Sequence, residues 1–162
     1  MNDDFDFQIL RLTDKFYKDY PKEKYPELLE KIGRSYNCLL FQSHYGYFIG
    51  VPYRSEVKHN NAFKFKDTKR SKYHSSGLDF TKIVIIQNPD YIGYKSSIID
   101  FDEYVKTKQN INKIASKVIS YIDCYVNHVK KIHILEDTIF QRKYLYSTLK
   151  YFHKELGIEN CE

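Results

Sequence analysis

The chain has 162 residues, a formal net charge of +5 and an excess of tyrosine (16) and phenylalanine (11) without tryptophan. This length is typical of a single domain, and three widely spaced cysteines and histidines without an HExxH motif predict neither a disulfide framework nor a metal site. An acidic N-terminal stretch and the lack of a long apolar run predict a cytoplasmic protein that is neither secreted nor membrane-spanning.

The first third of the chain predicts strands separated by short helical segments. Apolar residues alternate over 5–12, which favours a strand, and Thr13 can cap a short helix that Pro21 ends. A second short helix is predicted over 26–32. Two β-rich runs, 34–42 and 47–51, flank Ser-His-Tyr-Gly and therefore predict a hairpin.

The middle of the chain concentrates the positive charge. Between Arg54 and Lys82 eight basic residues stand against three acidic ones, so this window carries the whole formal net charge. A local cationic field predicts an anionic partner. The FKFK sequence at 63–66 favours a short strand and residues 67–77 a loop, while residues 82–87 give the strongest pattern of a central strand.

The last third changes to helical periodicity, after a shorter strand predicted over 96–99. Apolar residues recur at three- and four-residue steps, which predicts one long amphipathic helix over 103–130 and a final helix over 137–156. Strands come first and helices last, without a βαβ rhythm. We therefore predict one domain over 1–162 of α+β class, with a twisted antiparallel sheet or partly closed barrel and C-terminal helices.

Four motifs in order carry a family resemblance. They are FQILRL, RSYNCLLFQSHYGYFIGVPYRSEVKH, SGLDFTKIVII and LKYFHKELGI, and the second ends in the pattern Pro-aromatic-Arg-Ser-x-x-Lys-His. Over most of its length the chain resembles the toxins of type III toxin–antitoxin systems, the ToxN/AbiQ superfamily, and looks closest to its CptN-like branch.

The resemblance implies a fold and an activity. Such toxins have a twisted antiparallel core similar to the Kid/MazF toxins, and they cut adenine-rich cellular or phage mRNA without a metal or other cofactor. Each is inhibited by a small repeat RNA, folded as a pseudoknot, which the toxin trims and holds in a closed toxin–RNA assembly. The implied outcome is growth arrest, often used in phage defence.

The resemblance also implies site residues. Ser55 falls on the motif serine at the centre of the family's active site. Arg54 stands where better-known members have threonine, and a valine stands where a lysine is expected, so the adjacent Lys58 is assigned the cationic role. Upstream, the family's basic residue and a tyrosine of the same region correspond to Arg34 and Tyr36.

Metal-free RNA cleavage requires the same residue types. The 2'-hydroxyl of the substrate is the nucleophile, so the protein must stabilise charge on the phosphorus centre and move two protons. Arg34, Arg54 and Lys58 suit the phosphate because they are cationic. Ser55 can donate a hydrogen bond to a phosphoryl oxygen, and His59 is the predicted proton-transfer group because imidazole titrates near neutrality.

Seven further residues of the basic window are predicted to contact RNA: Lys64, Lys66, Lys69, Arg70, Lys72, His74 and Lys82. Alternatives remain open at the level of sequence. Ser55 could be a turn hydroxyl, His74 a solvated imidazole, and the basic cluster a solubility patch. Two other functions fit the same pattern: a non-catalytic RNA-binding protein, and a toxin that acts on tRNA or ribosomes by another chemistry.

Overall fold

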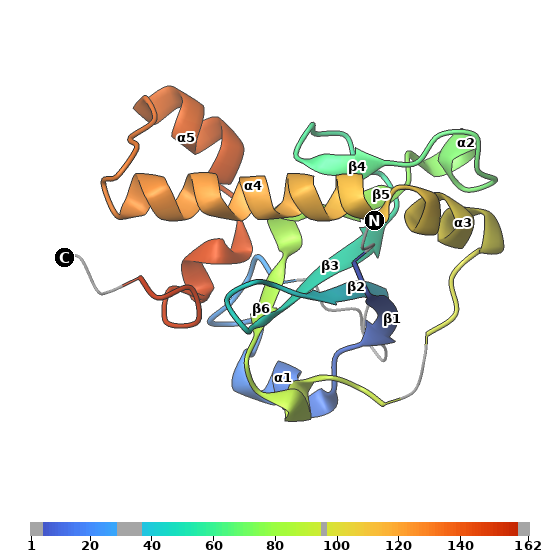
Figure 1. Cartoon of the computed structure of the whole chain (residues 1–162), viewed down its shortest axis with the longest axis horizontal. Coiled ribbons are helices and arrows are strands. Elements are labelled where there is room, and N and C mark those ends of the chain that lie inside the picture. The colour runs from blue at the N-terminus through green and yellow to red at the C-terminus, as the bar shows by residue number, and fades with distance from the viewer. Residues whose placement is uncertain (1–4, 29–36, 95–96, 159–162) are drawn as a thin grey trace.

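The computed structural model of the chain describes residues 5–28, 37–94 and 97–158, in which six antiparallel strands form one sheet and helices pack beside it (Figure 1). The predicted α+β class with an antiparallel sheet is confirmed. The strands are β1 (Phe7–Arg11), β2 (Asn37–Gln42), β3 (Phe48–Arg54), β4 (Ala62–Lys64), β5 (Gly77–Asp79) and β6 (Val84–Ile86).

Strand β3 is the centre of the sheet. The predicted hairpin joins it to β2 through a turn at Gly46, whose φ of 89° is favourable for glycine. On its other edge β3 pairs first with β6, over Phe48–Gly50, and then with β5, over Tyr53–Arg54. The end of β3 therefore lies against β5, and the motif that follows Arg54 leaves the sheet at this point.

The sheet is open, so the predicted partly closed barrel is wrong. Its strand order is β1-β2-β3-β5-β4, and the end strands β1 and β4 do not pair with each other. The outer edge of β1 is instead covered by a loop, because Gly93 and Ser97 donate backbone hydrogen bonds to the carbonyls of Arg11 and Ile9. An edge covered by a loop cannot accept another strand.

The helices are α1 (Asp14–Asp19), α2 (Ser71–His74), α3 (Phe101–Gln109), α4 (Ile111–Val129) and α5 (Asp137–Tyr144), with 3-10 turns at Phe80–Lys82, Pro89–Tyr91 and Thr148–Tyr151. Helix α4 crosses the sheet in Figure 1 and buries an apolar stripe that includes Ile114, Val118 and Ile122. No helix within the described ranges combines the length and apolar character that crossing a bilayer requires.

The predicted helix over 103–130 is two helices, because Asn110 interrupts it. The side-chain amide of Asn110 donates to the Lys106 carbonyl at 2.8 Å, and its backbone N–H bonds the carbonyls of Lys106 and Thr107. The side-chain amide competes with the helical backbone bond for the Lys106 carbonyl, and the dihedral angles of Asn110, φ of −115° and ψ of 16°, are not helical. Helix α3 therefore ends at Gln109, and α4 begins one residue after Asn110.

Four other segments also differ from the sequence predictions. The predicted helix over 137–156 stops at Tyr144, because the Ser147 side chain caps a 3-10 turn by accepting from the Leu149 N–H at 3.2 Å. The predicted loop over 67–77 contains the short helix α2. Of the predicted helix over 26–32 only residues 26–28 are described, and they are not helical, and residues 97–99 form no strand.

Candidate functional site

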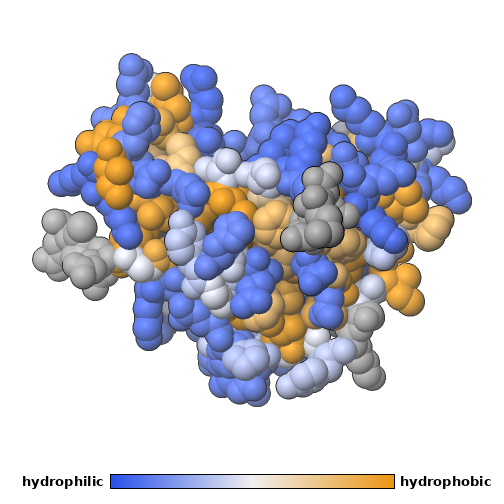
Figure 2. Space-filling view, in the orientation of Figure 1, coloured by the Kyte–Doolittle hydropathy of each residue, from blue (hydrophilic) through white to orange (hydrophobic). Residues whose placement is uncertain are grey.

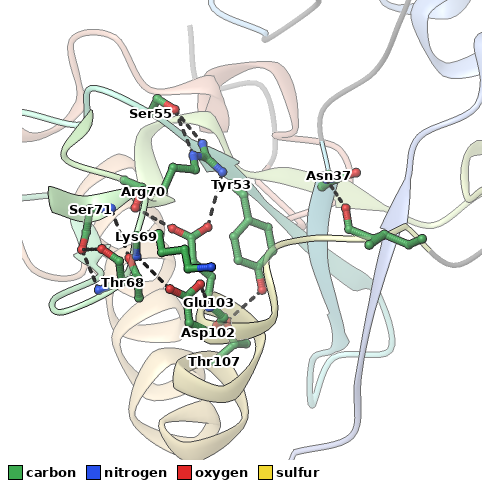
Figure 3. A network of polar contacts seen from close by, with 12 residues as sticks. Asn37, Tyr53, Ser55, Thr68, Lys69, Arg70, Ser71, Asp102, Glu103 and Thr107 are labelled. Atoms are coloured by element: carbon green, nitrogen blue, oxygen red, sulfur yellow. Dashed lines mark hydrogen bonds and ion pairs between the residues drawn. The ribbon is translucent and has the colours of Figure 1, made fainter. Parts of the chain in front are cut away.

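Neighbouring residues at the end of β3 reach opposite sides of the sheet, as alternation along a strand requires. The Tyr53 hydroxyl lies 2.9 Å from Thr107 Oγ1 on α3, and Ser55, just beyond the strand, joins contacts on this same side (Figure 3). Arg54 instead contacts Asp79. The residues that the motif places side by side in sequence therefore belong to two separate networks.

In the first network Arg70 holds Ser55. The Ser55 Oγ accepts hydrogen bonds from Arg70 Nε at 3.1 Å and from Nη2 at 2.7 Å (Figure 3). A serine hydroxyl has two acceptor lone pairs and one hydrogen to donate. Because Arg70 occupies both acceptor positions, the hydrogen of Ser55 remains available for another acceptor. Both residues are only partly buried, so an anion can reach them.

The buried carboxylate of Glu103 also holds the guanidinium of Arg70. Glu103, whose side chain is 1% exposed, lies 3.3 Å from Arg70 Nη1 and accepts a hydrogen bond from Ser76 Oγ at 2.6 Å. Burial raises the pKa of Glu103, and the opposing contributions of Ser76 and Arg70 do not cancel this effect. Arg70 thus bridges a buried acid and the hydroxyl of Ser55.

Helix α2 places Arg70 in this position. Thr68 and Ser71 bond each other reciprocally, with each backbone N–H donating to the other side chain at 3.0 and 3.1 Å. The backbone N–H of Lys69 donates to Asp102 Oδ2 at 2.8 Å, which ties the start of α2 to α3. The sequence predicted Arg70 as an RNA contact, but its pairing with Ser55 depends on this fold of residues 67–77.

The second network is built around Asp79, whose side chain is fully buried. Its carboxylate accepts from Arg54 Nη1 at 2.8 Å and from the backbone and hydroxyl of Thr81 at 2.9 and 2.6 Å. Burial opposes ionisation, but the hydrogen bonds from Thr81 and Arg54 outweigh it, so the pKa of Asp79 is lowered. Asp79 and Thr81 were missed as partners because the sequence shows no pattern that links them to Arg54.

His59 belongs to this second network. Its Nδ1 accepts from the Asn61 backbone N–H at 3.1 Å, and its Nε2 lies 3.1 Å from Asp79 Oδ1, buried and without hydrogen-bond geometry. Both ring nitrogens therefore face the protein. This placement fits a residue that anchors the loop after β3 better than one that transfers a proton to a substrate.

The other predicted cations take different positions. Lys82 donates from Nζ to the Tyr146 carbonyl at 2.9 Å, and burial lowers its pKa. Lys58 is exposed, and its carbonyl accepts from Lys64 Nζ at 3.4 Å. Lys69 and Lys72 are exposed around α2. The predicted catalytic residues Arg34 and Tyr36 lie outside the described residues.

A basic groove lies between β4 and the α3–α4 pair. Its volume is about 390 Å³, and it is lined by Asn60, Ala62, Phe63, Lys64, Phe65, Lys66, Lys106, Asn110, Lys113 and Lys117. Five of these residues are lysines and none is acidic. Figure 2 shows hydrophilic residues gathered over this part of the molecule.

Three of the groove lysines were missed from the sequence. With Asn110, the lysines Lys106, Lys113 and Lys117 stand at steps of four, three and four residues, which is the spacing of one face of the predicted helix over 103–130. This spacing is visible in the sequence beside the apolar stripe of the same region. The positive surface therefore extends beyond the basic window of 54–82.

A larger cavity of about 920 Å³ has a different character. It lies between β1 and residues 89–94 and 97–104, and most of its lining is apolar, including Ile9, Leu40, Phe48 and Ile98. It contains none of the predicted site residues. The basic groove and the Ser55 network are therefore the better candidates for binding an anion.

Among the described residues, no three histidine, cysteine, aspartate or glutamate side chains gather as metal ligands would. The polar groups around the end of β3 include the Ser55 hydroxyl, the fixed Arg70 guanidinium, the Arg54–Asp79 ion pair and an imidazole–carboxylate pair formed by His74 and Glu56, with the lysine-lined groove nearby. Comparisons of the chain with protein-family models, with curated proteins and with solved structures found no match.

Proposed function

We propose that this chain is the toxin of a type III toxin–antitoxin system, a metal-independent endoribonuclease that cuts adenine-rich RNA in the cytoplasm. The observation that carries the proposal is the Ser55–Arg70 pair. A hydroxyl whose acceptor sites are both filled by a guanidinium can only donate, which suits it to bind a phosphoryl oxygen. The motif resemblance independently assigns the central role to Ser55.

The proposed reaction follows from these groups. The 2'-hydroxyl of the ribose attacks the adjacent phosphorus, the bond to the 5'-oxygen breaks, and a 2',3'-cyclic phosphate forms. Negative charge on the phosphoryl oxygens increases in the transition state, where Ser55 and Arg70 stabilise it because both are already in place. Lys58, exposed in the same loop, supplies further positive charge.

The basic groove supports the choice of RNA as the substrate. Lysines attract the phosphates of a strand without selecting its sequence, and the Lys64 contact to the Lys58 carbonyl connects the groove to the loop after Ser55. We propose that substrate mRNA, cellular or phage, enters along it. A repeat RNA antitoxin, folded as a pseudoknot, would occupy the same surface, be trimmed by the toxin and remain bound in a closed toxin–RNA assembly.

Induced expression of the chain in bacteria should stop growth and produce new RNA ends within adenine-rich stretches of mRNA. Expression of the Ser55→Ala variant to the same level should leave growth and RNA intact. The new RNA ends are located by mapping 5' ends across total RNA. Ends confined to tRNA or ribosomal RNA would favour the rival toxin chemistry, and an absence of new ends would contradict the proposal.

A second candidate, a non-catalytic RNA-binding protein, is favoured by the groove alone. Replacing Lys106, Lys113 and Lys117 with glutamine should weaken binding of single-stranded RNA and reduce the log–log salt slope by about 2, since each phosphate contact contributes about 0.7. A matched triple variant of the exposed lysines 18, 22 and 24 should bind like wild type. Equal slopes for the two variants would exclude the groove as the RNA site, and binding without product would favour the second candidate.

A further inference from the structure

We propose that His74 is the group that removes the proton from the 2'-hydroxyl, with Glu56 as its positioning residue; this rests on the proposed ribonuclease function. His74 Nδ1 lies 3.0 Å from Glu56 Oε1. A carboxylate at this distance holds the proton on Nδ1 and leaves Nε2, on the other side of the ring, as an acceptor. The two side chains are 57% and 55% exposed, so a substrate can reach them.

The pair is next to the Ser55 network. Ser55 and Glu56 are consecutive, and Arg70 and His74 are one helical turn apart, linked by a His74 N–H to Arg70 carbonyl bond of 2.9 Å. Two parallel contacts, Ser55 to Arg70 and Glu56 to His74, therefore join the loop after β3 to α2. A phosphate held by Ser55 and Arg70 would place its neighbouring ribose beside the imidazole.

The backbone around both partners is held in an unusual conformation. Glu56 has φ of 59°, and Ser75, directly after His74, has φ of 46°. The Glu56 N–H donates to the His74 carbonyl, and the Val57 N–H donates to the Ser75 carbonyl at 3.0 Å. Left-handed backbone is unfavourable for a glutamate and persists where the surroundings impose it, often at functional sites.

His59 does not offer a ring nitrogen that could accept the 2'-hydroxyl proton. Its Nδ1 accepts a backbone hydrogen bond and its Nε2 is buried against Asp79, so no ring nitrogen is open to a ribose. His74 instead has one nitrogen fixed and one open. The charged groups around it are Glu56 across the contact and Arg70 and Lys72 on α2, with Glu103 of α3 reaching Arg70.

The proton balance of the proposed step is complete. Nε2 of neutral His74 accepts the 2'-hydroxyl proton as the ribose oxygen forms its bond to phosphorus. The bond from phosphorus to the 5'-oxygen breaks with its electron pair, and this oxygen takes a proton from water. The imidazolium then returns its proton to the hydroxide that remains, which restores the neutral enzyme.

The test is single-turnover cleavage of an adenine-rich oligonucleotide from pH 5 to 8, with affinity measured separately. The rate of the wild type should rise with pH and then level off, as expected for a general base. His74→Gln should be slower at the plateau by about 100-fold or more, and its rate should not show the rise with pH. Affinity for the oligonucleotide should change little.

The Glu56→Asn variant tests whether Glu56 positions His74 or only stabilises the fold. Asparagine tolerates left-handed backbone, so the variant should unfold at the same or a higher temperature while its cleavage rate falls about 10-fold. Asp67→Asn is the matched control, because Asp67 is an exposed acidic residue with φ of 61° outside the pair, and its rate should equal that of wild type.

A rate within about threefold of wild type for His74→Gln, or an unaltered pH profile, would overturn the assignment while leaving the ribonuclease function standing. Wild-type protein that cleaves no RNA would overturn both.

Discussion

Asp79→Asn should lower the free energy of unfolding by about 3 kcal/mol at pH 7. The variant removes the charge from a fully buried carboxylate and leaves Arg54 without its ion-pair partner. Arg54 is 32% exposed, so the expected loss lies at the lower end of the range for a buried pair. For a chain of this length the midpoint of thermal unfolding should fall by roughly 6–12 °C, as calorimetry can measure.

The stability that Asp79→Asn loses should depend on pH, and the direction follows from the pKa of Asp79. The pKa of Asp79 is lowered in the folded protein. The ionised carboxylate therefore contributes to the free energy of unfolding above pH 3.8, its ordinary pKa, and this contribution is lost as the pH falls through the lower pKa of the folded protein. The difference in the free energy of unfolding between wild type and Asp79→Asn should therefore become smaller below pH 3.8. Asp123→Asn is the contrasting control, since burial raises the pKa of Asp123, and this variant should not lose stability at pH 7. If Asp79→Asn lowered the free energy of unfolding at pH 7 by less than about 1 kcal/mol, the stabilising role of the buried Asp79–Arg54 pair would be contradicted.

Ser55→Ala should reduce the rate of RNA cleavage by about 100-fold or more, because it removes one fixed donor from the transition state. Affinity for RNA should be nearly unchanged, since the groove lysines remain. Arg70 keeps its ion pair with Glu103 in the variant, so the fold should persist. Ser120→Ala, which changes an exposed serine of α4, is the matched control and should cleave like wild type.

The strands were the most predictable part of the fold. The strands predicted over 5–12, 34–42, 47–51, 63–66 and 82–87 appear as β1, β2, β3, β4 and β6, because alternating or continuous apolar residues suffice to bury one or both faces of a strand. The helices were less predictable at their ends. Asn110 and Ser147 stop helices through their own side-chain hydrogen bonds, which a count of apolar residues does not register.

The candidate site was predicted in part. The motif located Ser55, but it did not indicate that Arg70, fifteen residues later, would return to hold the serine hydroxyl. That pairing requires α2, a helix of four residues that depends on tertiary contacts with α3. Sequence proximity also did not indicate the partner of His59, because the loop after β3 brings this residue to Asp79 in the second network and not to Ser55.

The most direct test of the central claim is single-turnover cleavage of an adenine-rich oligonucleotide in EDTA, by wild type and Ser55→Ala at saturating protein, with analysis of the product ends. Wild type should cleave and leave a 2',3'-cyclic phosphate, and the variant should cleave more slowly by about 100-fold or more at equal affinity. Cleavage that stops in EDTA, or equal rates for the two proteins, would contradict the central claim.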